Sequence, residues 1–193
     1  MTGADSDPGA PALATAETVV AFWRTAGPKR WFSKDASFDA TIRERFGWTH
    51  EAAARGALDA WRDSAVGALG LILLLDQFSR NLWRESARAF ACDPLARAVA
   101  REALACGHDL ATPPDMRLFF YLPYTHSEAQ NDQDQAVALG EALEQAGGPS
   151  AKSAREHRDI IRRFGRFPHR NGLLGRTTTT EEQAFLAKGG FAG

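Results

Sequence analysis

The chain has 193 residues, 44% of them hydrophobic and 24% charged, and a formal net charge of −1, as expected for one globular domain. This near-neutral balance argues against a general binder of nucleic acids or membrane surfaces. The longest apolar run, residues 65–75, falls short of the roughly 20 residues that a membrane span needs, so it predicts a buried core helix.

The amino-terminal segment and the cysteines predict the cellular compartment of the protein. Residues 1–14 are rich in Gly, Pro and Ala and lack the pattern of a secretory signal, so we expect a disordered lead-in before one helical domain over residues 15–193. Cys92 and Cys106 lie in Ala-rich helical sequence, which is typical of small buried apolar residues. Two such cysteines without a secretory signal indicate a reducing compartment, and we expect a cytoplasmic protein.

Helical periodicity dominates the amino-terminal half, without a clear alternating run of β-branched residues. Ser33 is the expected N-cap of a helix carrying Phe38 and Phe46, and Thr49 is the expected cap of a short Ala-rich helix. Apolar spacing and chain breakers predict helices over residues 16–24, 33–46, 51–61 and 64–81.

The carboxy-terminal half carries stronger start and stop signals. Asp93 is the expected N-cap of a helix with Pro94 at its first position, and capping boxes are expected at Ser127 and Thr180. These signals predict helices over residues 93–107, 112–122, 127–146, 150–167 and 180–186. Eight or nine helices with short connections favour an all-α fold of antiparallel helix pairs.

A polar cluster continues the apolar run. Asp76, Arg80 and Arg84 are spaced four residues apart and therefore share one helix face, with Asn81 on the adjacent strip. Charged groups at the end of a buried helix must be paired. The cluster is either an internal Asp76–Arg80 ion pair that ties the helix to its neighbours or the wall of a pocket.

A second cluster, His126 and Glu128, lies where a helix is expected to begin. Glu128 falls in the first helical turn, where the helix dipole favours a carboxylate, so a capping role is one explanation for it. His126 is a candidate general base, metal ligand or hydrogen-bonded core histidine.

The third and densest cluster runs from Arg155 to Arg176, with seven arginines and two histidines against two acidic residues. The spacing of His157 with Ile160 and Phe164 places this histidine on the apolar face of a helix. Outward-pointing arginines on the same helix are expected to be structural: Arg155, Arg158 and Arg162.

Beyond this helix, Pro168 ends the helical pattern and leaves His169, Arg170 and Asn171 on a short loop. Convergent arginines suit a carboxylate or phosphate, which a guanidinium binds through two hydrogen bonds. The alternative for Arg163 and Arg166 is structural: bonds to helix-end carbonyls and salt bridges with Glu181 and Glu182.

Recognised cofactor and metal patterns are missing from the sequence. Among His126, Glu128, His157, His169 and Asp76, no pair has the spacing of a zinc or di-iron motif, so we expect no bound metal and no cofactor. Glycine-rich nucleotide-binding motifs and the nucleophile elbow of α/β-hydrolases are also missing.

Three segments together resemble one bacterial family, domain of unknown function 924: residues 73–81, 119–128 and 163–171. The similarity extends over about residues 16–188 and implies an α-helical fold like that of tetratricopeptide-repeat proteins, in a right-handed array, but no activity. Ser79 departs from the family pattern, in which proline is expected.

Three functions are compatible with these clusters. The first is a module that binds an anionic small molecule or an acidic peptide, but no nucleic acid or membrane. The second is a hydrolase or proton-transfer enzyme acting on an anionic substrate, with His126 or His169 as acid and base. The third is a structural ion-pair network in a protein-interaction scaffold. The candidate binding residues are Asp76, Arg80, Asn81, His126, Glu128, His157, Arg163, Arg166, His169, Arg170 and Asn171.

Overall fold

The computed structural model describes residues 12–191, and these form helices and loops without a β-strand. The α-helical segments are α1 (Ala16–Ala26), α2 (Pro28–Trp31), α3 (Ala36–Ala54), α4 (Ala65–Ile72), α5 (Ser79–Leu82), α6 (Asp93–Ala105), α7 (Pro114–Thr125), α8 (Gln130–Gln145), α9 (Lys152–Phe164) and α10 (Thr180–Ala187). A π-helical turn, Leu73–Phe78, joins α4 to α5 into one helix. The described residues therefore contain nine separate α-helices, which confirms the all-α prediction.

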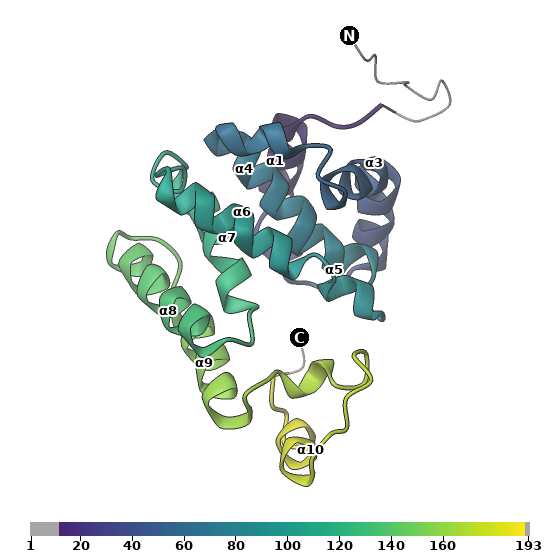
Figure 1. The fold of residues 1–193 in the computed structure, drawn as a ribbon, viewed down its shortest axis with the longest axis vertical. Helices are drawn as coiled ribbons and strands as arrows, with labels where there is room; N and C mark the ends of the chain where they lie inside the picture. The colour runs from purple at the N-terminus through teal and green to yellow at the C-terminus, as the bar shows by residue number, and fades with distance from the viewer. Residues whose placement is uncertain (1–11, 192–193) are drawn as a thin grey trace.

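The core surrounds the predicted central helix, α4 with its π-helical extension. Helices α1, α6 and α7 pack against α4, while α3 packs against the π-helical turn and α5 (Figure 1). Leu73, Leu74 and Phe78 are completely buried. The Trp23 ring contacts the rings of Phe78 and Phe119 at centroid distances of 5.4 and 5.8 Å. This burial confirms that the apolar run is a core helix.

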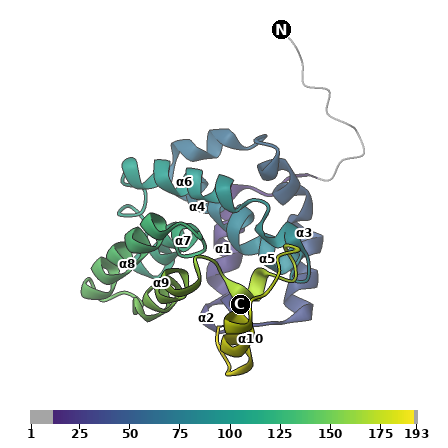
Figure 2. The ribbon, with the colours of Figure 1, turned by 60° about the horizontal axis from the view of Figure 1, so that its bottom comes forward.

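The carboxy-terminal helices form a second layer beside this core. Helix α8 packs on α7 and α9 packs on α8, and both views show α8 and α9 side by side (Figure 2). The chain then reverses at Gly165, whose φ of 68° suits glycine, and passes through a short 3-10 turn, Pro168–Arg170, to α10. This return segment, residues 166–187, brings the third polar cluster back toward the core.

Two helix starts in the amino-terminal half were predicted wrongly. The N-cap of α3 is Asp35 rather than Ser33, because the Asp35 carboxylate accepts hydrogen bonds from the amides of Ser37 and Phe38. Thr49 does not begin a new helix, because α3 continues to Ala54. The buried Thr49 hydroxyl instead accepts a hydrogen bond from the Ala14 amide at 2.9 Å.

Several other predicted helix ends differ from those in the structure. Helix α8 begins at Gln130, and the Ser127 hydroxyl donates to Asp132 at 2.6 Å instead of capping the helix. Pro123 lies inside the last turn of α7, where it removes only one helical hydrogen bond. Three further corrections shift an end by a few residues: Asp93 is the first residue of α6, α9 ends at Phe164, and the last capping box is built on Thr179.

Some burial predictions were wrong as well. Of the two cysteines expected to be buried, Cys106 is exposed and Cys92 is half-buried. The large aromatic side chains of Phe32 and Trp48 are 62% and 59% exposed. The predicted lead-in lies mostly outside the described residues, which begin at residue 12. Over residues 12–191, none of the helices combines the length and apolarity needed to cross a bilayer.

Candidate functional site

A pocket of about 700 Å³ lies between the core helices, α7 to α9 and the carboxy-terminal return segment. Much of its wall is apolar, with a charged and imidazole-rich part where the three polar clusters meet. Side chains from four parts of the chain form that polar part: Arg80, His126, His157, His169 and Arg170. The pocket therefore gathers residues that lie up to 90 positions apart in the sequence.

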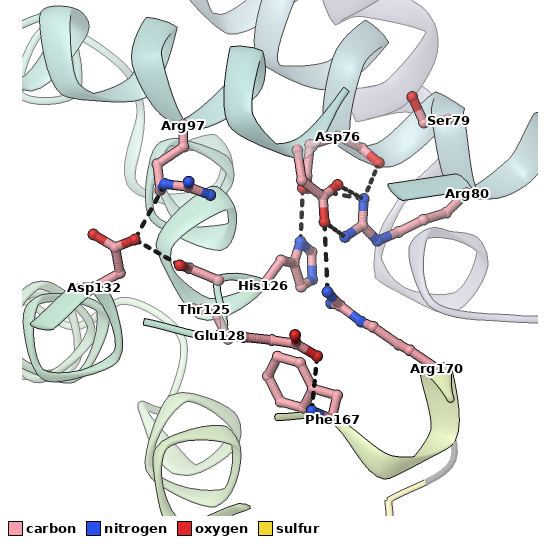
Figure 3. A network of polar contacts seen from close by, with 12 residues as sticks. Asp76, Ser79, Arg80, Arg97, Thr125, His126, Glu128, Asp132, Phe167 and Arg170 are labelled. Atoms are coloured by element: carbon pink, nitrogen blue, oxygen red, sulfur yellow. Dashed lines mark hydrogen bonds and ion pairs between the residues drawn. The ribbon is translucent and has the colours of Figure 1, made fainter. Parts of the chain in front are cut away.

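Asp76 lies behind the polar part of the pocket and binds two of its side chains. It lies in the π-helical turn, a helix irregularity that is common at functional sites, and its side chain is completely buried. Its Oδ1 atom lies 2.7 Å from His126 Nδ1 and 3.2 Å from Arg80 Nη1 (Figure 3). Burial raises the pKa of Asp76, but Arg80, His126 and Gln77 outweigh it and hold this pKa well below its usual range. The buried carboxylate is therefore ionised.

Arg80 connects Asp76 to a second carboxylate. Its Nη1 atom donates to the Asp76 carbonyl at 2.7 Å, and its guanidinium forms two hydrogen bonds with Asp93 at 3.0 and 3.2 Å. Burial lowers the pKa of Arg80, but Asp76 and Asp93 together raise it. The ion pair expected from the i, i+4 spacing is present, and Arg80 also lies on the pocket wall.

Arg170 is a buried charge of the pocket that has an ion-pair partner but no hydrogen bond. It is 6% exposed, and its guanidinium lies over the rings of Phe90 and Phe167 at 4.6 and 4.5 Å. The closest carboxylate is that of Asp93, at 3.6 Å. Within residues 12–191 its side chain forms no hydrogen bond, and its Nε atom is buried without a partner. Burial, followed by the charge of Arg80, lowers the pKa of Arg170 to about 10.

The three histidines of the pocket are neutral. His157 Nδ1 lies 2.7 Å from the Ser153 carbonyl, which can only accept, so Nδ1 carries the proton and Nε2 is free to accept one. The ionised Asp76 carboxylate imposes the same tautomer on His126. Burial lowers the pKa of His157 to about 4 and that of His169 to about 3, and it also lowers the pKa of His126.

Other predicted site residues hold the return segment in place. Glu128 accepts two hydrogen bonds from Arg176, at 2.7 and 3.0 Å, and one from the Phe167 amide at 2.8 Å. Glu182 accepts from Arg166 at 2.6 and 2.8 Å and from Asn171 at 3.2 Å. Hydrogen bonding by Arg166 lowers the pKa of Glu182 to about 2. These side chains fix the loop that carries Arg170.

The described structure thus divides the predicted residues into two groups. Six of them line the pocket: Arg80, Asn81, His126, His157, His169 and Arg170. Asp76 lies behind His126, while Glu128, Arg166 and Asn171 brace the return segment and Arg163 pairs with Glu181 at 2.9 Å. The salt bridges expected as the structural alternative for Arg163 and Arg166 are both present.

Sequence reasoning missed Asp93, Arg176 and the apolar wall. Asp93 was interpreted as a helix cap because it precedes a proline, yet its carboxylate binds Arg80, 13 residues earlier. Only three-dimensional packing reveals such a partner.

Among residues 12–191, no group of three His, Cys, Asp or Glu side chains is arranged to hold a metal ion.

Comparison with known proteins places this arrangement in a family. The family described as bacterial protein of unknown function, DUF924, matches residues 19–190. The chain belongs to DUF924. A solved structure, the protein of unknown function ATU0120 from Agrobacterium tumefaciens, is 51% identical, with a TM-score of 0.86 over 90% of this chain and 97% of that one. Among curated proteins, none matches the chain.

Family membership confirms the resemblance drawn from the three segments. At the position where the DUF924 pattern was expected to hold proline, the Ser79 hydroxyl donates to the Leu75 carbonyl at 2.7 Å and lies 2.8 Å from His50 Nε2. The helix therefore continues through Arg80 and Asn81 in α5.

Proposed function

We propose that this protein binds a small organic anion, whose charged group occupies the polar part of the pocket beside Arg170. The observation that carries this proposal is the buried Arg170 guanidinium, which lines the pocket without a hydrogen bond to any described residue. A buried guanidinium without a hydrogen bond is costly even beside a carboxylate such as Asp93 at 3.6 Å, and a bound carboxylate or phosphate supplies two charge-assisted hydrogen bonds.

The charges around Arg170 support a compact anion. Asp76 and Asp93 balance Arg80 and Arg170, so these four charges cancel. An entering anion raises the pKa of the neighbouring histidines, and their protonation compensates its charge. Because Arg170 and His157 are each only 6% exposed, a small molecule fits this site better than an acidic peptide does.

Calorimetric titration with acetate, butanoate, benzoate and phosphate tests the proposal. Arg170→Gln should weaken binding by about 10- to 100-fold, because a hydrogen bond to a charged group contributes about 1.5–3 kcal/mol. The matched control is Arg155→Gln, since Arg155 lies on α9 and pairs with Glu141 outside the pocket. Equal loss in both variants, or no binding of any anion to the unmodified protein, would contradict the proposal.

The arrangement of α6 to α9 supports a finer description of the fold. Consecutive helices in this region are joined by short connections and pack against one another. We propose that they form antiparallel pairs in a right-handed array of the tetratricopeptide-repeat kind, with the pocket on its inner side. The cytoplasm remains the proposed compartment.

The hydrogen bond between Asp76 and His126 supports a second candidate, an acid–base enzyme acting on the bound anion. A buried carboxylate that holds Nδ1–H orients the imidazole and leaves Nε2 as a general base on the pocket wall. Arg80 and Arg170 would stabilise negative charge that develops during hydrolysis or proton transfer. Loss of turnover in His126→Gln with unchanged anion affinity would support this function, whereas unchanged turnover would exclude His126 as the base.

A further inference from the structure

Resting on the proposed anion site, we infer that the ligand is amphipathic: a carboxylate or phosphate that carries an alkyl chain or an aryl group. The reason is that the pocket continues from its charged part along apolar walls. On α7, Leu118, Tyr121 and Leu122 follow helical spacing and turn one face toward the cavity. Small and apolar side chains of the facing helices complete these walls: Ala136, Leu143, Ala151 and Ala154.

The dimensions of the pocket require a ligand larger than an inorganic anion. His126, at the charged part, lies eight residues after Leu118, so the α7 wall extends roughly 12 Å from one to the other. The volume of about 700 Å³ falls within the range of sites for organic ligands. A lone phosphate at Arg170 would leave most of this apolar wall uncovered.

An exposed aromatic residue marks the apolar side of the pocket. Phe32 contributes to the pocket lining, although 62% of its surface is exposed. An alkyl or aryl group in the pocket would cover part of this ring and of the half-buried Leu118 side chain. The apolar walls offer few partners for a peptide backbone, which favours a hydrocarbon chain over an acidic peptide.

Titration with butanoate, hexanoate and octanoate tests the inference on the unmodified protein. Affinity should rise by about 4-fold for each added methylene, because burying one CH₂ contributes about 0.8 kcal/mol. Octyl phosphate compares the two head groups, and octanol lacks the charge. Octanol should bind at least 10-fold more weakly than octanoate, because it cannot form the charge-assisted bonds to Arg170.

Leu118→Asn examines the apolar wall directly, with Leu110→Asn as the control because Leu110 is 70% exposed and does not line the pocket. The Leu118 variant should lose most of the gain in affinity from butanoate to octanoate, while the control keeps it. Equal affinity for butanoate and octanoate in the unmodified protein would overturn the amphipathic ligand but leave the anion site standing. Octanol binding as tightly as octanoate would overturn the anion site itself.

Discussion

Asp76 organises the polar part of the pocket at the scale of single residues, because Arg80 and His126 both bind its carboxylate. Its substitution by asparagine keeps the shape but removes the charge, which leaves Arg80 with Asp93 alone. Asp76→Asn should destabilise the protein by about 3–5 kcal/mol, the usual cost of breaking a buried ion pair.

Chemical unfolding in urea measures this effect. The control is Asp115→Asn, because Asp115 pairs with Arg24 on the surface and both side chains are about half exposed. Loss of that pair should change the free energy of unfolding by about 0–1 kcal/mol. A similar small effect for Asp76→Asn would show that the buried network contributes little to stability.

His157 gives a prediction about acid sensitivity. Its pKa is about 4 in the folded protein, below the ordinary value of 6.5, so the unfolded chain binds more protons between these values. The free energy of unfolding should therefore fall as the pH drops from about 6.5 to 4, by about 3 kcal/mol from this residue. Urea unfolding across this range should show a shallower decline in His157→Asn, and an unchanged decline would refute the assignment.

Individual site residues could be predicted only where a local sequence pattern indicates them. The Asp76–Arg80 pair follows from i, i+4 spacing, and the arginine-rich run around Arg170 is evident from composition. Asp76 and Glu128 were both candidates to orient the histidines, and local spacing could not choose between them as the partner of His126, because Asp76 lies 50 residues away. Nothing in the local pattern indicates that Arg166 is hydrogen-bonded to Glu182 whereas Arg170 has no hydrogen bond.

The return segment after α9 is the element on which the site depends, because it carries His169 and Arg170. Glu128 attaches this segment to the connection between α7 and α8 through the Phe167 amide and Arg176. Several helix ends were misplaced because neighbouring polar residues compete as caps, as with Ser33 and Asp35. The π-helical turn at Asp76 has no sequence signal that we recognise.

Glu128→Gln should loosen this segment without unfolding the core. Losing hydrogen bonds to a charged group costs about 1.5–3 kcal/mol, so amide exchange over residues 166–187 should become about 10- to 100-fold faster. Hydrogen exchange followed by mass spectrometry measures it. Glu181→Gln is the control, since the Glu181–Arg163 pair is more than half exposed. Equal exchange in the two variants would count against this role of Glu128.

The whole molecule creates the pocket by folding the third polar cluster back against the first two. Composition and periodicity predicted the all-α class and the core helix, because both depend on local spacing. The apolar wall depends on how α7, α8 and α9 pack, so periodicity alone did not reveal it. In the sequence, the residues of the apolar wall have only the spacing of ordinary helix-packing positions.

Anion binding should be linked to proton uptake across the whole site. An anion near His157 and His169 raises their pKa values by about 1–3 units, from about 4 and about 3. The complex then holds more protons than the free protein, so affinity should increase between pH 7.5 and pH 5.5. Titrations in buffers of different ionisation enthalpy measure the proton uptake, and its absence at pH 5.5 would contradict the proposed position of the anion.

A crystal structure of the protein with octanoate tests the central claim most directly. The account predicts carboxylate oxygens about 2.7–2.9 Å from the Arg170 guanidinium, with the alkyl chain along Leu118 and Leu122. Octanoate bound elsewhere, or placed in the pocket with its carboxylate away from Arg170, would contradict it.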